Sequence, residues 1–214
     1  MNDLIPISQE TNYLDPQSFH KFISTIPRIP TYHSAYVNQT SMPPFGYQLL
    51  FQILYYCALR VSEGLNLVKS DFDLDRRILR IRNAKTSKGK VQKTSIPPPL
   101  LQILKSCWDK LPEKLFSTSR QTTWSVGKQV GKLAELNIFE EQDERSIEGV
   151  WTHLFRKSYA KFMYNNGATG ALIDVKLRHS KPKSRDMADS TFTYIKPDIN
   201  KLIHWEHERF TQHG

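Results

Sequence analysis

The spacing of hydrophobic positions predicts a mainly helical protein. Residues 45–59 (FGYQLLFQILYYCAL) are nearly all apolar, and because this run is too long for a strand we expect a buried helix there. A second helix is expected to begin with Ser62 as its cap and to end near Lys69. Further helices are expected over residues 100–110, 122–136, 154–165, 171–177 and 198–210, the last of them amphipathic.

Two short strands complete the pattern. In residues 77–83 (RILRIRN) one face with Ile78, Arg80 and Arg82 alternates with another of Leu79 and Ile81, which is the period of a half-buried strand. Residues 91–96 form a second candidate strand. The stretch between them is polar and contains Gly89, so a hairpin is the simplest connection. These elements predict an α+β, mostly α-helical fold with a small antiparallel β-sheet.

The first thirty residues differ in character from the rest of the chain. Residues 1–30 are polar and punctuated by proline, with an apolar spacing around Phe19 and Phe22 that would form one small helix, ended by Pro27. We therefore expect residues 1–30 to be an N-terminal arm or linker. The folded domain, including the C-terminal helix, is expected over residues 31–214.

Composition excludes several classes of protein. The chain has 214 residues, of which 39% are hydrophobic and 11% aromatic, enough to build a core and too much for a disordered chain. No stretch approaches the roughly 18 uninterrupted apolar residues that cross a bilayer, and the N-terminal sequence does not resemble a secretory signal. Only Cys57 and Cys107 are present, which predicts a reducing, cytoplasmic setting. Membrane, secreted and disulfide-scaffold proteins are therefore not expected.

Charge is segregated along the chain, with a net value of +9. Residues 76–93 hold eight Lys or Arg and no acid, residues 176–185 hold five more, and residues 135–148 carry six acids against Arg145. Such segregation indicates a polyanion-binding face backed by an acidic surface, whereas a single basic run is often only a solvated face. The side chains expected to contact DNA are Arg80, Arg82, Lys88, Lys90, Lys181, Lys183 and Arg185.

Four separated motifs occur in one order. They are Ala58-Leu59-Arg60-Val61-Ser62-Glu63, Lys85 in the hairpin, His153-Leu154-Phe155-Arg156, and Leu177-Arg178-His179 followed by Tyr194. Together they resemble the catalytic domain of the tyrosine recombinases, the family of the phage integrases, Xer proteins and Cre. The resemblance covers about residues 45–197 and implies the DNA breaking-rejoining catalytic fold for residues 31–214.

The resemblance assigns a role to each motif residue, and the chemistry asks for the same residue types. Attack on a phosphodiester passes through a phosphorane with extra negative charge, which the two guanidiniums of Arg60 and Arg156 would stabilise. Lys85 on the hairpin would protonate the leaving 5′-oxygen, with Lys88 as the alternative acid. Tyr194 would be the nucleophile that forms a 3′-phosphotyrosyl bond.

The two histidines of the motifs complete this scheme. His153 would tune the attacking tyrosine or bind the phosphate, and His179 would donate a hydrogen bond to the same phosphate. Each residue also has an ordinary structural interpretation, such as a core histidine for His153 or packing for Tyr194. The scheme requires no cofactor and no metal ion.

The chain departs from the family pattern at two places. His179 and Tyr194 are fifteen residues apart rather than the family's usual nine or so, and Arg178 stands where the family typically has glycine. The other tyrosines near the site, Tyr159 and Tyr164, follow Arg156 on the same helix and are expected to face the core.

The function predicted is that of a site-specific DNA recombinase, or integrase, that cleaves and rejoins strands. The alternatives are a type IB topoisomerase-like enzyme and a non-catalytic DNA-binding protein that retains the fold. The partners expected are double-stranded DNA and further copies of the chain, in a tetramer on paired sites. Residues 198–210 would dock on a neighbouring copy or, with equal support, on their own domain. Because only 59 residues precede Arg60, we expect a catalytic domain with a short arm, either a short recombinase or a fragment of one that has the family's DNA-clamping N-terminal domain.

Overall fold

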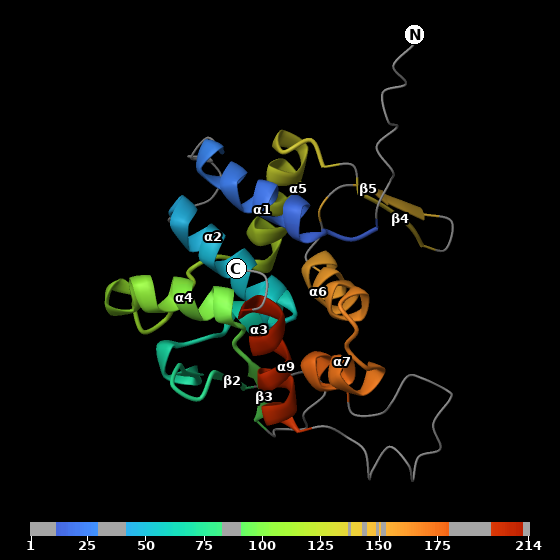
Figure 1. Cartoon of the computed structure of the whole chain (residues 1–214). Helices are drawn as coiled ribbons and strands as arrows, with labels where there is room; N and C mark the ends of the chain where they lie inside the picture. The colour runs from blue at the N-terminus through green and yellow to red at the C-terminus, as the bar shows by residue number, and fades with distance from the viewer. Residues whose placement is uncertain are drawn as a thin grey trace.

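A long apolar helix organises the described part of the protein. The computed structural model describes residues 12–29, 42–82, 91–136, 138–142, 145–148, 150, 153–179 and 198–211. The expected buried helix is α2 (Pro44–Tyr56), which begins on Pro44, a residue suited to the first helical position. Leu50, Phe51 and Ile53 of α2 are completely buried. Helices α1, α3, α4 and α6 contact α2, so the hydrophobic core is built around it (Figure 1).

Most other predicted elements are confirmed with small shifts at their ends. Helices form at α3 (Val61–Leu65), α4 (Pro98–Cys107), α5 (Arg120–Leu133), α6 (Leu154–Asn165), α7 (Gly170–Leu177) and α9 (Ile199–Thr211). Single 3-10 turns follow α1, precede β1 and follow α4, at Ile26–Arg28, Lys69–Asp71 and Trp108–Lys110. Gly167 ends α6 with a φ of +79°, a conformation that glycine adopts without strain.

The beginning of α3 differs from its prediction. Arg60, not Ser62, is the capping residue, and the Glu63 carboxylate accepts the backbone N–H of Arg60 at 2.9 Å. The helix ends at Leu65 rather than near Lys69. The side chain of Asn66 donates to the Ser62 carbonyl, and a separate 3-10 turn then begins at Lys69.

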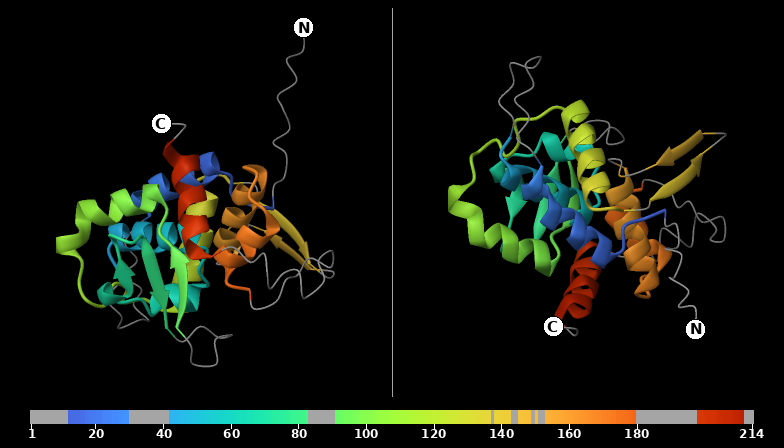
Figure 2. Two further views of the ribbon diagram at one scale, coloured as in Figure 1. Left: turned by 60° about the horizontal axis from the view of Figure 1, so that its bottom comes forward. Right: turned by 90° about the horizontal axis from the view of Figure 1, so that it is seen from above.

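The three-stranded sheet lies at one side of the helical body. Strands β1 (Phe72–Asp73), β2 (Ile78–Ile81) and β3 (Gln92–Ser95) are antiparallel, with Ile78 opposite Ser95. The predicted hairpin is therefore confirmed, whereas the two-residue strand β1 was too short to be predicted. Helix α9 lies alongside β3 (Figures 1 and 2).

A second pair of strands forms in the acidic segment, where no strand was predicted. Strands β4 (Phe139–Gln142) and β5 (Arg145–Glu148) are antiparallel, with Phe139 opposite Glu148. Figure 2 shows this hairpin projecting from the body beside α6.

The N-terminal segment differs from the arm predicted over residues 1–30. Helix α1 (Pro16–Thr25) inserts its aromatic side chains into the core: Phe19 stacks on Tyr55 with ring centroids 3.8 Å apart, and Phe22 packs edge-on against Phe51 at 5.1 Å. Phe22 is completely buried. Residues 16–29 are therefore part of the folded domain, because their apolar side chains complete a core that α2 and α6 leave open.

The helix that follows Arg156 corrects another expectation. Tyr159 is completely buried, as predicted, but the side chain of Tyr164 is 66% exposed. No helix among the described ranges is long and apolar enough to cross a membrane.

Candidate active site

The turn after α2 presents the first motif arginine. Ala58 holds a φ of +49°, which reverses the chain between α2 and α3 and places Arg60 at the start of α3. Nη1 of Arg60 lies 2.9 Å from Oε1 of Glu63. The Arg60 side chain is 33% exposed and that of Glu63 only 3%, so the arginine reaches solvent while its partner is buried.

The second motif arginine joins the first turn to α7. Arg156 is buried on the first turn of α6 and donates from Nη1 to the carbonyl oxygen of Ala58 at 2.6 Å. Its Nη2 donates to the carbonyl oxygen of Leu177. Burial, followed by the nearby charges of Arg178 and Arg60, lowers the pKa of Arg156 to about 9, so it stays protonated at neutral pH.

The motif histidines occupy different environments. His179 directly follows α7, and its Nδ1 lies 2.8 Å from Oδ1 of Asp174, so that carboxylate fixes the orientation of the ring. With Nδ1 engaged, Nε2 of the half-buried ring is the nitrogen left to meet a substrate. His153 is exposed at the N-terminal end of α6, which excludes its interpretation as a core histidine.

Arg178 lies in the same cluster as Arg60 and Arg156, although its sequence position suggested no role for it. It ends α7 with φ +56° and ψ +39°, the left-handed conformation that glycine favours. Its side chain is 3% exposed, and Nη2 lies 2.8 Å from Oε2 of Glu63. The signal in the sequence was an arginine where the family typically has glycine; its acidic partner lies in the first motif, 115 positions away.

The arrangement concentrates positive charge around one carboxylate. Arg60, Arg156 and Arg178 surround the turn at Ala58, and only Glu63 opposes them in the pairs described here. Burial by itself raises the pKa of Glu63, but the Arg178 charge, the Arg60 hydrogen bonds and the Arg60 charge together hold it below its ordinary value. A cluster with excess guanidinium charge suits an anionic phosphate.

The structure brings together only part of the predicted site. Arg60, Arg156 and His179 are joined through the Ala58 turn and the end of α7. Lys85 and Tyr194 lie outside the described residues. So do five of the expected DNA contacts, Lys88, Lys90, Lys181, Lys183 and Arg185.

The two described DNA-contact candidates lie near the sheet with exposed side chains. Nε of Arg82 is 2.7 Å from Oδ1 of Asp71, and Nη2 of Arg80 is 3.5 Å from Oδ2 of Asp73. Their side chains are 55% and 42% exposed, so both can be reached by a partner. Their contact with DNA stays a prediction.

Comparison with known proteins decides the family. The sequence profile of the phage integrase family matches residues 20–187. The chain belongs to the phage integrase family. The resemblance of the four motifs to tyrosine recombinases is thereby confirmed.

Named relatives in this family are recombinases and integrases. Tyrosine recombinase XerA of Thermococcus onnurineus (strain NA1) is 30% identical over 145 residues, which are 62% of this chain and 46% of that protein. A probable integrase/recombinase of Acholeplasma phage L2 is 24% identical over 173 residues, 78% of this chain and 54% of that protein. The chain thus spans about half the length of these curated relatives.

Solved structures identify the fold of this phage integrase family chain. A crystal structure of XerA recombinase has a TM-score of 0.60 at 20% identity, covering 88% of this chain and 66% of that chain. The catalytic domain of bacteriophage HP1 integrase has a TM-score of 0.53 at 19% identity, covering 86% and 87%. The fold class predicted from the motifs, that of the tyrosine recombinase catalytic domain, is confirmed.

A buried ionic network in this phage integrase family fold was missed by sequence analysis. Lys176 is completely buried, and its Nζ lies 2.7 Å from Oε1 of Glu206 and 2.9 Å from Oγ of Ser95. The hydroxyl of Tyr159 donates to the same Glu206 oxygen at 2.9 Å. Helices α6, α7 and α9 and strand β3 therefore meet at Glu206.

This network corrects two expectations. Lys176 and Arg178 belong to the basic run of residues 176–185 but point inward, so they add no charge to a solvated face. Because Glu206 lies in α9 and its partners lie in the body, α9 packs on its own domain, one of the two dockings that the sequence left open.

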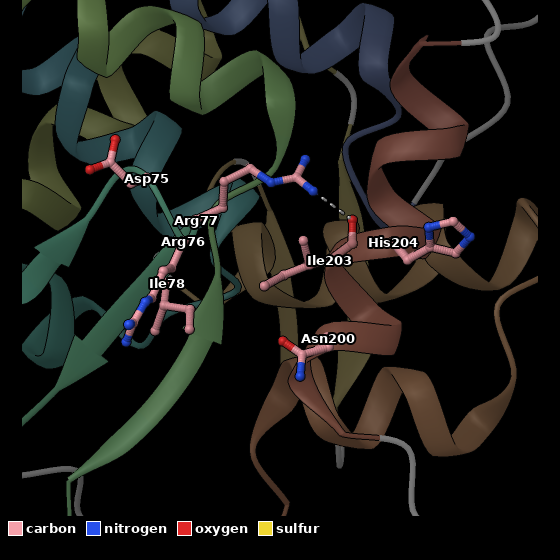
Figure 3. A pocket seen from close by; sticks show the side chains of 7 residues that line it. All are labelled: Asp75, Arg76, Arg77, Ile78, Asn200, Ile203 and His204. Carbon is pink, nitrogen blue, oxygen red and sulfur yellow. Dashed lines mark hydrogen bonds between the residues drawn. The ribbon is translucent and has the colours of Figure 1, made fainter.

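An open hollow lies between the turn before β2 and α9 (Figure 3). Its volume is about 450 Å³, and none of its lining residues is a predicted site residue. Nη2 of Arg77 donates to the carbonyl oxygen of Ile203 at 3.5 Å, so this turn reaches across to α9. The hollow is open to solvent and distinct from the arginine cluster.

Proposed function

We propose that the chain is the catalytic part of a site-specific DNA recombinase that cleaves and rejoins strands through a 3′-phosphotyrosyl intermediate. The observation that carries this proposal is that Arg156 bonds the carbonyl oxygens of Ala58 and Leu177, and so joins the turn that leads into Arg60 to the end of α7, which His179 follows. Two guanidiniums and an imidazole in one place supply hydrogen-bond donors to the non-bridging oxygens of a phosphodiester.

The burial of each group supports its role in this reaction. The Arg60 side chain is one third exposed and can reach a bound phosphate, whereas Arg156 is held by two backbone carbonyl oxygens. Nδ1 of His179 donates to Asp174, so the doubly protonated ring would donate from Nε2 to the same phosphate. A preorganised set of donors stabilises charge as it develops on the phosphorane.

The bond-making residues are proposed from the motifs. The hydroxyl oxygen of Tyr194 attacks phosphorus, and its proton passes to His153. The bond from phosphorus to the 5′-oxygen breaks, and Lys85 gives that oxygen its proton, leaving a free 5′-hydroxyl. Reversal of these steps with a different 5′-hydroxyl joins the new strands, so the energy of the phosphodiester bond is conserved.

The basic runs extend this site into a DNA-binding face. Arg82 would leave Asp71, and Arg80 would leave Asp73, to bind phosphates of the DNA backbone. Further phosphate contacts would come from Lys88, Lys90, Lys181, Lys183 and Arg185. Binding through phosphates releases counterions, so affinity falls steeply with salt. We further propose that the working assembly is a homotetramer on paired double-stranded DNA sites, acting in the cytoplasm.

Covalent trapping tests this function. The protein is mixed with end-labelled duplex from the flanks of its own gene, quenched with denaturing detergent and examined for a labelled protein–DNA adduct. We expect an adduct with the unaltered protein and with Tyr164→Phe, the exposed tyrosine of α6, and none with Tyr194→Phe. An adduct that survives in Tyr194→Phe contradicts the nucleophile. Relaxation of supercoiled plasmid without any exchange between paired sites would instead indicate a topoisomerase.

A further inference from the structure

Arg178 has a conformation that calls for an explanation. It adopts the left-handed region at φ +56°, where a Cβ is unfavourable and glycine is the usual residue. A glycine there would end α7 without strain. The backbone turn therefore does not explain the arginine, and the contacts of its guanidinium do.

The guanidinium connects three parts of the site. Nη2 pairs with Glu63 at 2.8 Å and approaches the Ala58 carbonyl oxygen at 3.3 Å. Nη1 donates to the carbonyl oxygens of Lys176 at 3.1 Å and Cys57 at 3.3 Å. The end of α7, which carries His179, is thus fixed to the turn that carries Arg60.

Glu63 has two cationic partners that differ in freedom. Its Oε1 faces Arg60, whose side chain is 33% exposed, and its Oε2 faces Arg178, whose side chain is 3% exposed. A buried carboxylate without a cation is strongly unfavourable. If Arg60 alone neutralised Glu63, a phosphate would have to compete with that carboxylate for the arginine.

We propose that Arg178 is a positioning residue, the permanent counterion of Glu63, which frees Arg60 to bind the scissile phosphate. Both terminal nitrogens of Arg178 are engaged by Glu63 and by three backbone carbonyl oxygens, so its guanidinium stays with the carboxylate. When the phosphate arrives, Arg60 turns from Oε1 of Glu63 to the phosphate oxygens, and Glu63 keeps Arg178 at Oε2. The inference rests on the proposed function, in which Arg60 is a phosphate ligand.

The test measures anion binding by Arg60 without any need for cleavage. Inorganic phosphate is titrated into the ¹⁵N-labelled full chain, and the Nε–Hε resonance of Arg60 reports the dissociation constant. We expect Arg178→Gly to weaken phosphate binding about tenfold, because Arg60 then becomes the only cation of Glu63. Arg178→Lys, which keeps the charge, should stay within about threefold of the unaltered chain.

A second substitution separates positioning from a merely structural role. In Arg178→Gly the further change Glu63→Gln removes the carboxylate that competes for Arg60, so we expect phosphate affinity to recover to within about threefold. A structural role predicts that the second change deepens the loss. The matched control is Arg77→Gly, because Arg77 also has a left-handed backbone, with φ +56°, and lies outside the site. This substitution should leave phosphate affinity unchanged.

Two outcomes would overturn the inference: phosphate affinity in Arg178→Gly equal to that of the unaltered chain, or a double variant that binds more weakly than Arg178→Gly. If Arg178→Gly does not fold, as judged by its thermal transition, the phosphate affinities of Arg178→Lys and Arg178→Gln are compared instead. Arg178→Gln, which lacks the charge, should then bind phosphate more weakly than Arg178→Lys. Failure of the proposed function would appear separately, as an absent Tyr194 adduct with the unaltered protein.

Discussion

Arg156 and Ala58 are joined by a hydrogen bond of 2.6 Å between Nη1 and the carbonyl oxygen, across ninety-eight positions of sequence. The carbonyl is available because Ala58 turns out of helix α2 with a positive φ. One buried arginine thus fixes the backbone turn that presents the other. Substitutions should therefore affect them jointly.

Arg156→Lys should nearly abolish covalent trapping. A lysine has no planar fork and cannot contact both the Ala58 and Leu177 carbonyl oxygens while facing a phosphate. We expect adduct formation to slow by about 100-fold, the usual cost of losing a preorganised donor. The measurement is the initial rate of adduct formation, with exposed Arg28→Lys as the control. A rate within a factor of three of the control would contradict the role of Arg156.

The buried network around Glu206 should dominate the stability of the C-terminal helix. Lys176→Met leaves Glu206 as an unpaired buried charge, so we expect the free energy of unfolding to fall by about 3–5 kcal/mol in urea. The double variant Lys176→Met, Glu206→Leu should recover most of the lost unfolding free energy. A deficit of about 1–3 kcal/mol should remain, because the Tyr159 hydroxyl loses its acceptor. The control is His204→Gln in the exposed pair with Glu208, expected within about 0.5 kcal/mol. Equal effects at Lys176 and His204 would disprove the network.

Helix α1 should behave as part of the core. Phe22→Ala removes a completely buried ring that contacts Phe51 and Phe155 and should cost about 3–5 kcal/mol of unfolding free energy. Phe45→Ala, at a ring that is 48% exposed, is the matched control and should cost far less. If Phe22→Ala unfolds in urea like the control, residues 16–29 are an arm after all.

Stability should depend on the ionisation of Glu63 in acid. Its pKa is lower in the folded protein than the ordinary value of 4.5. The folded state therefore gains stability above about pH 4.5 and loses it as the pH falls through the folded pKa. Urea unfolding between pH 3 and 6 should show a steeper acid loss for the unaltered chain than for Glu63→Gln. Glu208→Gln, at an exposed carboxylate, should leave the slope unchanged.

Local patterns predicted the elements, because their causes are local. The apolar run that became α2 and the alternation around Leu79 and Ile81 depend on near neighbours, and both were correct. The exposure of Tyr164 could also have been predicted, because a separation of five residues on a helix places it about 140° from Tyr159. A helical-wheel projection of α6 would have placed the two tyrosines on different faces of the helix.

Pairings distant in sequence could not be predicted in the same way. Lys176 and Arg178 lie in a run of basic residues, which is typical of a solvated face. Their carboxylate partners, Glu206 and Glu63, lie 30 and 115 positions away, and only the folded chain brings them together. The motifs singled out Arg60 and Arg156 because the chemistry of phosphate recognition restricts the residue types, and their binding of a phosphate stays a prediction.

The most direct test of the central claim identifies the bond that the protein makes with DNA. Duplex from the flanks of its gene, nicked so that cleavage cannot reverse, is trapped on the protein, and the adduct is digested and sequenced by mass spectrometry. We expect one modified peptide, with Tyr194 joined to a 3′-phosphate, and a released fragment that bears a 5′-hydroxyl. A modification on any other residue, or a linkage to a 5′-phosphate, would contradict it.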